Sequence, residues 1–390
     1  MRKITLWTCL LLFSFANIQL QAQTLPYKNS TLSTEERVQD LLGRMTLEEK
    51  VAQLRHIHSE NVFDGQKLNK EKVKTFCQNM SFGFVEGLPL YSENCRDNFM
   101  KLQRYMVEET RLGIPVIITT EALHGMAQDG ATIFPQNIAL GSTFNPELAY
   151  RKSCAISEEL HTAGIRQVLA PCIDVVRDLR WGRVEESYGE DPWLCAQMGI
   201  AETKGYLNNH ISPMLKHYGA HGAPVGGLNL ASVDCGVRDL IDIYLKPFEM
   251  IVKGTNVKAI MSSYNSRDRI PNSASKFLMT ELLRDRWGFK GLVYSDWAAV
   301  DMLKSFHHVA EDKETAAILA LTAGLDVEAS SNCYPALVEA VRQGRCSMAV
   351  IDQAVSRVLQ VKIELGLFEN PYHTDGLAGT IHDSKKIKLA

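Results

Sequence analysis

The 390-residue sequence lacks several features that would assign it to a common functional class. It has no run of basic residues and no interleaving of basic with aromatic residues, and its formal net charge is −3 with a pI near 6.4. The composition therefore indicates no nucleic acid and no anionic membrane surface as a partner. After residue 23 no stretch approaches the roughly 20 apolar residues that cross a bilayer. A neutral substrate fits this composition better.

The sequence also lacks the spacings of common metal and phosphate sites. It has no CxxC pair, no HExxH motif and no glycine-rich phosphate loop, so we expect no metal and no cofactor. A chain of this size needs no disulfide staples, and we interpret most of its cysteines as small buried hydrophobic residues. Whether Cys77 pairs with Cys95 stays open. The eight cysteines that follow residue 23 are Cys77, Cys95, Cys154, Cys172, Cys195, Cys235, Cys333 and Cys346.

The N-terminus has the pattern of a secretory signal peptide. Arg2 and Lys3 form a short positive region, residues 4–20 are apolar, and Ala22 offers a small residue for cleavage near residue 23. Cys9 lies inside the apolar stretch rather than just after it, which argues against a lipoprotein anchor. We therefore predict that residues 1–23 are a signal peptide and that the protein is periplasmic or secreted.

Short runs of strand-forming residues alternate with longer stretches of helical spacing. The runs recur at intervals of about 30 to 50 residues, which favours a closed (β/α)8 barrel of the TIM type over a doubly wound sheet. We assign this α/β barrel to residues 24–370, with the eighth strand missing or degenerate. The seven runs are FGFVEGL near 82, IPVIITTE from 114, QVLAPCIDV from 167, PMLKHYG from 213, VKAIMSSYN from 257, GLVYSDW from 291 and GLDVEAS from 324.

Helix signals lie between and around these runs. Ser33 or Thr34 precedes a pair of glutamates in a capping pattern, and Val38 and Leu41 repeat at core spacing. Ser347 is placed to cap a second helix with an apolar stripe that runs up to Gly366. These helices are expected to be scaffold.

Polar residues gather where five of the runs end. The carboxyl ends of barrel strands converge on one face, and the chemistry of such barrels is found there. Each polar residue alone has a structural explanation, since it can simply satisfy a buried carboxylate, but agreement among five runs favours a site. The residues are Glu121 with His124, Asp174 with Arg177 and Arg183, Lys216 with His217, Tyr264 with Asn265, and Asp296 with Trp297.

This set of side chains suits a sugar. Charged and neutral donors can bind hydroxyl groups, and the face of Trp297 can stack on the C–H face of a pyranose. The carboxylate of Asp296 could attack an anomeric carbon if a second carboxyl about 5 to 5.5 Å away protonated the leaving oxygen. Cationic neighbours are expected to keep the attacking carboxylate ionised.

Seven stretches carry a resemblance to a known family. They are RMTLEEKVAQL, GIPVIITTEALHG, ATIFPQNIALGSTFNPEL, RDLRWGRVEESYGEDP, KHYGAHG, MSSYN and VYSDW. Over nearly all of residues 35–370 the chain resembles glycoside hydrolase family 3, the exo-acting β-glucosidases and β-xylosidases. The resemblance implies a barrel and a retaining mechanism that cleaves terminal β-D-glucosyl or β-D-xylosyl residues from plant-type oligosaccharides, with Asp296 as the nucleophile.

The resemblance also implies a sugar subsite. Arg183, Lys216, His217 and Tyr264 would position the sugar, and Glu121 would lie over its far hydroxyls. Many members have Asp at this last position, and the longer Glu is similar to the xylosidase-type pattern, which leaves less room for C6.

Other conspicuous residues do not transfer as site residues. The acidic segment EESYGEDP, with Glu185, Glu186, Glu190 and Asp191, resembles a structural loop beneath the site, and Asp174 is interpreted as architectural. Leu228 occupies a place near which xylosidase-type sequences often carry Arg, so no contact is assigned to this loop.

The general acid/base is the missing part. In most of the family it is a Glu in a following α/β-sandwich domain, and we expect residues 371–390 to be a linker toward such a domain. One subgroup uses an Asp-His pair after a similar KH motif; here Asp234 has no His two residues later, and His221 remains a weak candidate. Two hypotheses follow, a glycosidase barrel whose acid/base is not on this chain, and a carbohydrate-binding or inactive remnant.

Overall fold

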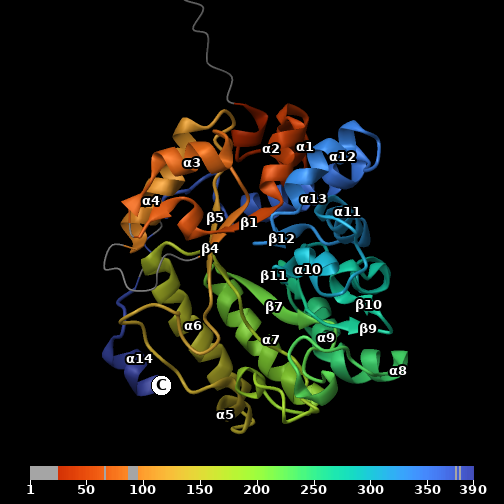
Figure 1. Cartoon of the computed structure of the whole chain (residues 1–390). Helices are drawn as coiled ribbons and strands as arrows, with labels where there is room; N and C mark the ends of the chain where they lie inside the picture. The colour runs from red at the N-terminus through yellow and green to blue at the C-terminus, as the bar shows by residue number, and fades with distance from the viewer. Residues whose placement is uncertain (1–24, 66, 87–94, 374–375, 377–378) are drawn as a thin grey trace, which may run out of the picture.

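A computed structural model describes residues 25–65, 67–86, 95–373, 376 and 379–390. The predicted signal peptide lies outside these residues. Eight parallel strands close into a barrel in the order β1, β12, β11, β8, β7, β6, β5, β4, and helices surround it (Figure 1). The predicted α/β barrel of the TIM type is confirmed. Among the described residues, no helix is long and apolar enough to span a bilayer.

The barrel strands are short, and each pairs in parallel with the strands beside it. Six of them lie within predicted runs, and β7 begins one residue before its run. The strands are β1 (Arg55–His58), β4 (Phe84–Glu86), β5 (Ile117–Thr120), β6 (Gln167–Val168), β7 (Ser212–Tyr218), β8 (Ala259–Ser262), β11 (Leu292–Trp297) and β12 (Val327–Ala329). Two small antiparallel pairs, β2 (Phe63–Asp64) with β3 (Lys67–Leu68) and β9 (Ser266–Arg267) with β10 (Ile270–Pro271), lie outside the barrel.

The expectation that the eighth strand is missing or degenerate was wrong. Strand β1 pairs with both β12 and β4 and closes the barrel between the two ends of the chain. Its sequence is RHIH, which holds a single apolar residue, Ile57, so no apolar run marks it. It alternates instead: the ring of His56 contacts the inward Tyr294 at 5.7 Å between centroids, while Ile57 joins the outer hydrophobic cluster.

The period of two along the strands decides which side chains reach the barrel mouth. On β4, Phe84 packs inside against Tyr294 at 4.9 Å between ring centroids, and Val85 faces the outer layer. The next residue, Glu86, therefore points inward again, one layer above Phe84. It is in register with His58 of β1, so these two polar side chains lie side by side at the carboxyl ends of their strands.

Helices cover the outside of the barrel. Both predicted caps are present: Ser33 forms a capping box with Glu36, and the Ser347 side chain accepts from the N–H of Ala349. The helices are α1 (Thr34–Arg44), α2 (Leu47–Gln53), α3 (Lys70–Cys77), α4 (Cys95–Arg104), α5 (Asn137–Gly141), α6 (Pro146–Ala163), α7 (Pro192–Asn208), α8 (Val237–Asp239), α9 (Lys246–Gly254), α10 (Ala299–Ser305), α11 (Lys313–Ala323), α12 (Leu337–Arg342), α13 (Met348–Glu364) and α14 (Ser384–Leu389).

The last described segment lies along helix α6 (Figure 1). The Oγ1 of Thr162 donates to the carbonyl of Gly379 over 2.7 Å, and the buried Lys386 in α14 forms an ion pair with Glu158 at 2.7 Å. Residues 379–390 are thus attached to the barrel. Their expected role as part of a linker stays a prediction.

The cysteines are thiols. All eight are free, six of them buried, and Cys77 and Cys95 do not pair. Burial raises the pKa of both of these thiols to about 12, so neither is a reactive thiolate.

Candidate active site

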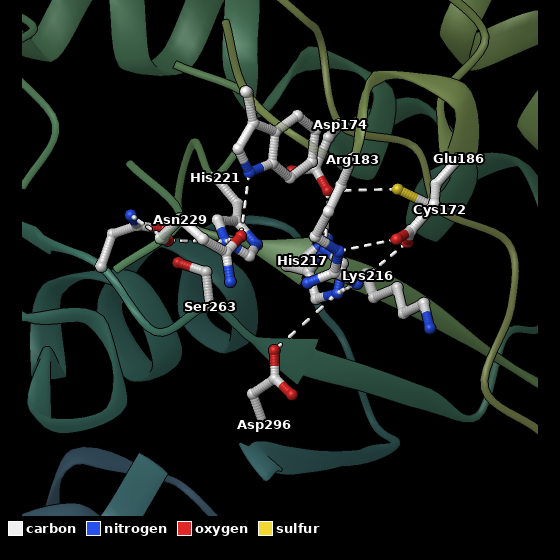
Figure 2. A network of polar contacts seen from close by, with 12 residues as sticks. Cys172, Asp174, Arg183, Glu186, Lys216, His217, His221, Asn229, Ser263 and Asp296 are labelled. Atoms are coloured by element: carbon white, nitrogen blue, oxygen red, sulfur yellow. Dashed lines mark hydrogen bonds and ion pairs between the residues drawn. The ribbon is translucent and has the colours of Figure 1, made fainter. Parts of the chain in front are cut away.

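Asp296 is the next-to-last residue of β11, at the mouth of the barrel, and is 3% exposed. Its Oδ1 accepts the N–H of Trp297 at 2.7 Å. Its Oδ2 is buried, has no hydrogen-bond partner among the described residues, and lies 3.8 Å from Nε2 of His217 (Figure 2). A buried carboxylate oxygen that lacks a partner is costly, so this oxygen is available to a ligand.

The charge of Asp296 is set by opposing effects. Burial raises its pKa to about 6, while the positive charge of Arg183 and the hydrogen bond from the Tyr264 hydroxyl lower it. The expectation that cationic neighbours control this carboxyl was thus incomplete, because desolvation outweighs them. The group is still mainly ionised at neutral pH.

His217 is held as a neutral imidazole with a fixed tautomer. Its Nδ1 lies 2.7 Å from Oδ2 of Asp174, which also accepts the backbone N–H of His217. Its Nε2 lies 2.8 Å from Nη2 of Arg183, which can only donate, so the ring proton is on Nδ1 (Figure 2). Burial and the charge of Arg183 push the pKa of His217 well below its usual value. Asp174 thus orients this ring, in agreement with its architectural interpretation.

Arg183 is aimed by a neighbour in its own loop. Glu186 accepts from its Nε at 2.7 Å and from its Nη2 at 2.9 Å. Burial disfavours the guanidinium charge, but the hydrogen bonds and charge of Glu186 raise the pKa of Arg183 above its usual value. This supports the prediction that the acidic loop is structural, since Glu186 positions Arg183 and Asp191 caps α7 through the N–H of Leu194.

Lys216 on β7 reaches past β6 to Glu121, which follows β5. Its Nζ lies 2.9 Å and 2.8 Å from the two carboxylate oxygens of Glu121. The lysine is 1% exposed, whereas the side chain of Glu121 is 36% exposed. Burial disfavours the positive charge of Lys216, but the negative charge of Glu121 outweighs this and raises the pKa of Lys216. The two side chains therefore form an ion pair at the base of the site, with Glu121 partly exposed to solvent.

Aromatic side chains border Asp296. Burial and the Asp296 charge raise the pKa of Tyr264, which stays a neutral donor toward that carboxyl. Trp297 is half-buried, and the ring of His58 stacks on it with 4.8 Å between centroids and 18° between planes. One face of this tryptophan is therefore occupied by protein.

His221 is unsuited to the role of general acid. Its Nε2 lies 3.0 Å from Oδ1 and 3.1 Å from the carbonyl oxygen of Asn229, two acceptors, so Nε2 carries the proton. Burial and the charge of Arg183 lower its pKa to about 3, and the ring is neutral at any ordinary pH. Asn229 also accepts from Nε1 of Trp181 and thereby joins two loops. Leu228 and Asp234 beside it are exposed.

The structure brings together Glu121, Arg183, Lys216, His217, Tyr264, Asp296 and Trp297, as the strand-end pattern predicted. Arg177 is exposed and does not belong to this group. The Nδ1 of His124 is buried and has no hydrogen-bond partner among the described residues.

Three polar residues at the mouth were missed. Glu86 lies inside the predicted run FGFVEGL and is the last residue of β4, so its place at the mouth follows from a strand end that the run did not mark. His58 ends β1, the strand that no apolar run in the sequence predicted. No sequence signal marks Asn229.

Two groups of side chains have metal-ligand atoms close together. Cys172, Asp174 and His217 form one, and His217, His221 and Asp296 form the other, each with atoms within 4.8 Å. The nitrogen and oxygen atoms of His217 and Asp174 already bond each other, and Arg183 donates to the remaining nitrogen of His217. Two nearby cations, the half-buried Arg183 and the buried Lys216, also disfavour a bound metal ion. The arrangement fits a hydrogen-bonding floor for a neutral polar ligand.

Comparisons with known proteins agree with this architecture. The Glycosyl hydrolase family 3 N terminal domain matches residues 46–361. A putative beta-xylosidase of Formosa agariphila is 35% identical over 90% of this chain and 48% of its own length. The periplasmic beta-glucosidase of Salmonella typhimurium is 31% identical over 89% of this chain and 44% of its own length.

Solved structures give the same result. A b-glucosidase from Erythrobacter marinus superposes with a TM-score of 0.88 and 31% identity, over 94% of this chain and 50% of that one. A mutant beta-glucosidase from Listeria innocua in complex with laminaribiose gives a TM-score of 0.83 at 30% identity, over 91% and 50%. The chain spans about half the length of these relatives. Since the family match covers most of its residues, the protein belongs to glycoside hydrolase family 3, as the N-terminal barrel domain of that family.

Proposed function

We propose that this barrel is the catalytic half of a retaining, exo-acting β-glycosidase that releases terminal β-D-glucosyl or β-D-xylosyl residues from plant-type oligosaccharides. The observation that carries the proposal is the unpartnered Oδ2 of Asp296, buried among donors at the carboxyl end of β11. Arg183, Lys216 and Tyr264 offer N–H and O–H groups to sugar hydroxyls around it, and His217 helps to hold Arg183 in place.

The reaction has two steps. Oδ2 of Asp296 bonds to the anomeric carbon while the bond from that carbon to the leaving oxygen breaks, and the leaving oxygen takes a proton from an acid. Water then attacks the same carbon, gives its proton to the conjugate base and frees the carboxylate. We place that acid/base outside this chain, because His221 is neutral and the relatives are about twice as long.

The substrate proposal rests on the floor and on the relatives. Glu121, with Lys216 behind it, can accept hydrogen bonds from the hydroxyls farthest from the anomeric carbon. The named relatives are beta-glucosidases and beta-xylosidases. The exposed part of the half-buried Trp297 ring is the surface on which the sugar or its leaving group can stack.

A fluorosugar with a dinitrophenyl leaving group tests this proposal. Such a leaving group needs no protonation, so the nucleophile alone suffices to form the covalent intermediate. Intact-mass analysis is expected to show one added fluoroglycosyl group, and peptide mapping is expected to place it on Asp296. Asp296→Ala should take up no label. A folded protein that binds sugar but is never labelled would instead be a binding remnant.

We also propose that the protein is exported. The support is the signal pattern of residues 1–23 and the periplasmic relative from Salmonella typhimurium. N-terminal sequencing of protein from the periplasm or medium should begin near residue 24; a cytoplasmic protein with an intact N-terminus would contradict this.

A further inference from the structure

Glu86 is a carboxyl at the barrel mouth with no assigned role. It points inward from the carboxyl end of β4, in register with His58 of β1, and its side chain is 20% exposed. Its nearest described partner is Nδ1 of His58, 3.7 Å from Oε2, which is too far for a hydrogen bond. Glu86 therefore has a mostly buried carboxyl that forms no hydrogen bond to the described residues.

The position of Glu86 around the barrel relates it to one edge of a sugar. From β11 through β8, β7 and β6 to β5 lie Asp296 and the proposed hydroxyl contacts, ending at Glu121. The remaining arc back to β11 consists of β4, β1 and β12. In a pyranose the ring likewise returns from C4 through C5 and the ring oxygen to C1. A sugar with C1 at Asp296 and its far hydroxyl at Glu121 must therefore turn its C5 edge toward β4 and β1.

At the end of β12, among the described residues, the arc offers only the small Ser330, whose Oγ is buried, whereas β4 and β1 end in longer polar side chains. Ala329 of β12 is small and in register with His56. Glu86 and His58 are the polar side chains that β4 and β1 add at this edge. We propose that Glu86 contacts the substituent on C5 and hydrogen-bonds the C6 hydroxyl of a hexoside, which makes it a specificity-determining residue for glucosides over xylosides. This inference rests on the proposed function.

The electrostatics of Glu86 suit a neutral hydroxyl. Burial and the negative charge of Glu121 raise the pKa of Glu86 to about 8, and Lys216 opposes this. His58 is the other titratable group that faces it. At neutral pH the carboxyl is therefore mainly protonated, and it can both donate to and accept from a hydroxyl group. Glucose has such a hydroxyl on C6 and xylose has none.

The test compares two labelling reagents on the same protein. The rate at which Asp296 is labelled is measured with a dinitrophenyl fluoroglucoside and with the matching fluoroxyloside, and the ratio of the two rates is taken. Glu86→Leu is expected to lower this ratio by about tenfold, because only the glucoside loses a hydrogen bond. Glu86→Gln, which resembles the protonated carboxyl, should retain most of it. Exposed Glu60→Ala serves as a control for unspecific effects.

The pH dependence gives a second readout that a merely structural role would not move. In the wild-type protein the ratio should change as pH rises through about 8, since Glu86 then turns from a donor and acceptor into a charged acceptor for the C6 hydroxyl. In Glu86→Gln it should stay flat. An unchanged ratio in Glu86→Leu, or a higher one, would overturn the inference while labelling itself persists. Absence of labelling with both reagents would instead contradict the proposed function.

Discussion

At the scale of single residues, Asp296 is placed where it weakens the fold. Its pKa of about 6 in the folded protein exceeds the ordinary value of 3.8, because burial disfavours the charge. A raised carboxyl pKa means that the folded state binds the proton more tightly than the unfolded chain does. The folded state therefore loses stability as pH rises from about 4 to about 6, and the loss is complete above that range.

Asp296→Asn should consequently stabilise the protein at neutral pH. A shift of this size corresponds to roughly 3 kcal/mol for a buried group, so the variant is expected to unfold at a higher temperature than the wild type at pH 7.5. At pH 4 the difference should shrink, since both proteins then carry an uncharged group. Thermal unfolding across this pH range measures it. A variant that is less stable at pH 7.5 would contradict this account of the carboxyl.

The residues of the site were predictable to different degrees. Asp296, Lys216 and Glu121 follow apolar runs, and their strand-end position is visible in the sequence. The orienting role of Asp174 on His217 is not visible, because the two are linked only by the pairing of adjacent strands. The neutrality of His221 also depends on burial and on Arg183, which no spacing reports.

At the scale of elements, Asn229 joins two loops at the mouth. Its Oδ1 accepts from Trp181 in the loop after β6, and from His221 at the end of the β7 strand region. Gly227 makes this approach possible: it has a φ of +74°, and a Cβ there would lie 2.5 Å from the Cβ of Arg180. The loops therefore behave as one unit.

Asn229→Ala should loosen that unit. The buried N–H of Trp181 loses its acceptor, while His221 keeps the backbone carbonyl of residue 229. One unsatisfied buried donor costs about 1 to 3 kcal/mol, so the melting temperature should fall and the loops should become sensitive to protease. Leu228→Ala, at an exposed neighbouring position, should change neither. Equal stability of the two variants would show that Asn229 is not the link.

The elements themselves were largely predictable, with one exception that has a physical reason. Seven strands carry apolar runs because both of their faces are buried. Strand β1 points His56 inward and ends in His58, so its inner face is polar. Ile57 is its only apolar residue, which is too little to form an apolar run. The short extent of β6 was not visible either: beyond Val168 its pairing with β7 continues irregularly, through Ala170, Pro171 and Ile173.

At the scale of the whole molecule, the chain spans about half the length of its relatives. If the acid/base lies outside this chain, an activated glycoside should glycosylate Asp296 quickly. The bound sugar should then be released slowly, because no base activates the water. Azide, which needs no base, should accelerate turnover and yield a glycosyl azide. Product release and azide adducts are measured by stopped-flow absorbance and mass spectrometry. Rapid hydrolysis of an unactivated disaccharide by this chain alone would place the acid/base within it.

Closure of the barrel by β1 ties the site to both ends of the sequence. Strand β1 lies between β4 and β12, so residues near 55 meet residues near 328, and His58 covers Trp297 only in the closed ring. A ribosome must have released most of the barrel before that seam can form. The mouth of the barrel, where these residues meet, is thus completed only after the chain has been synthesised past β12.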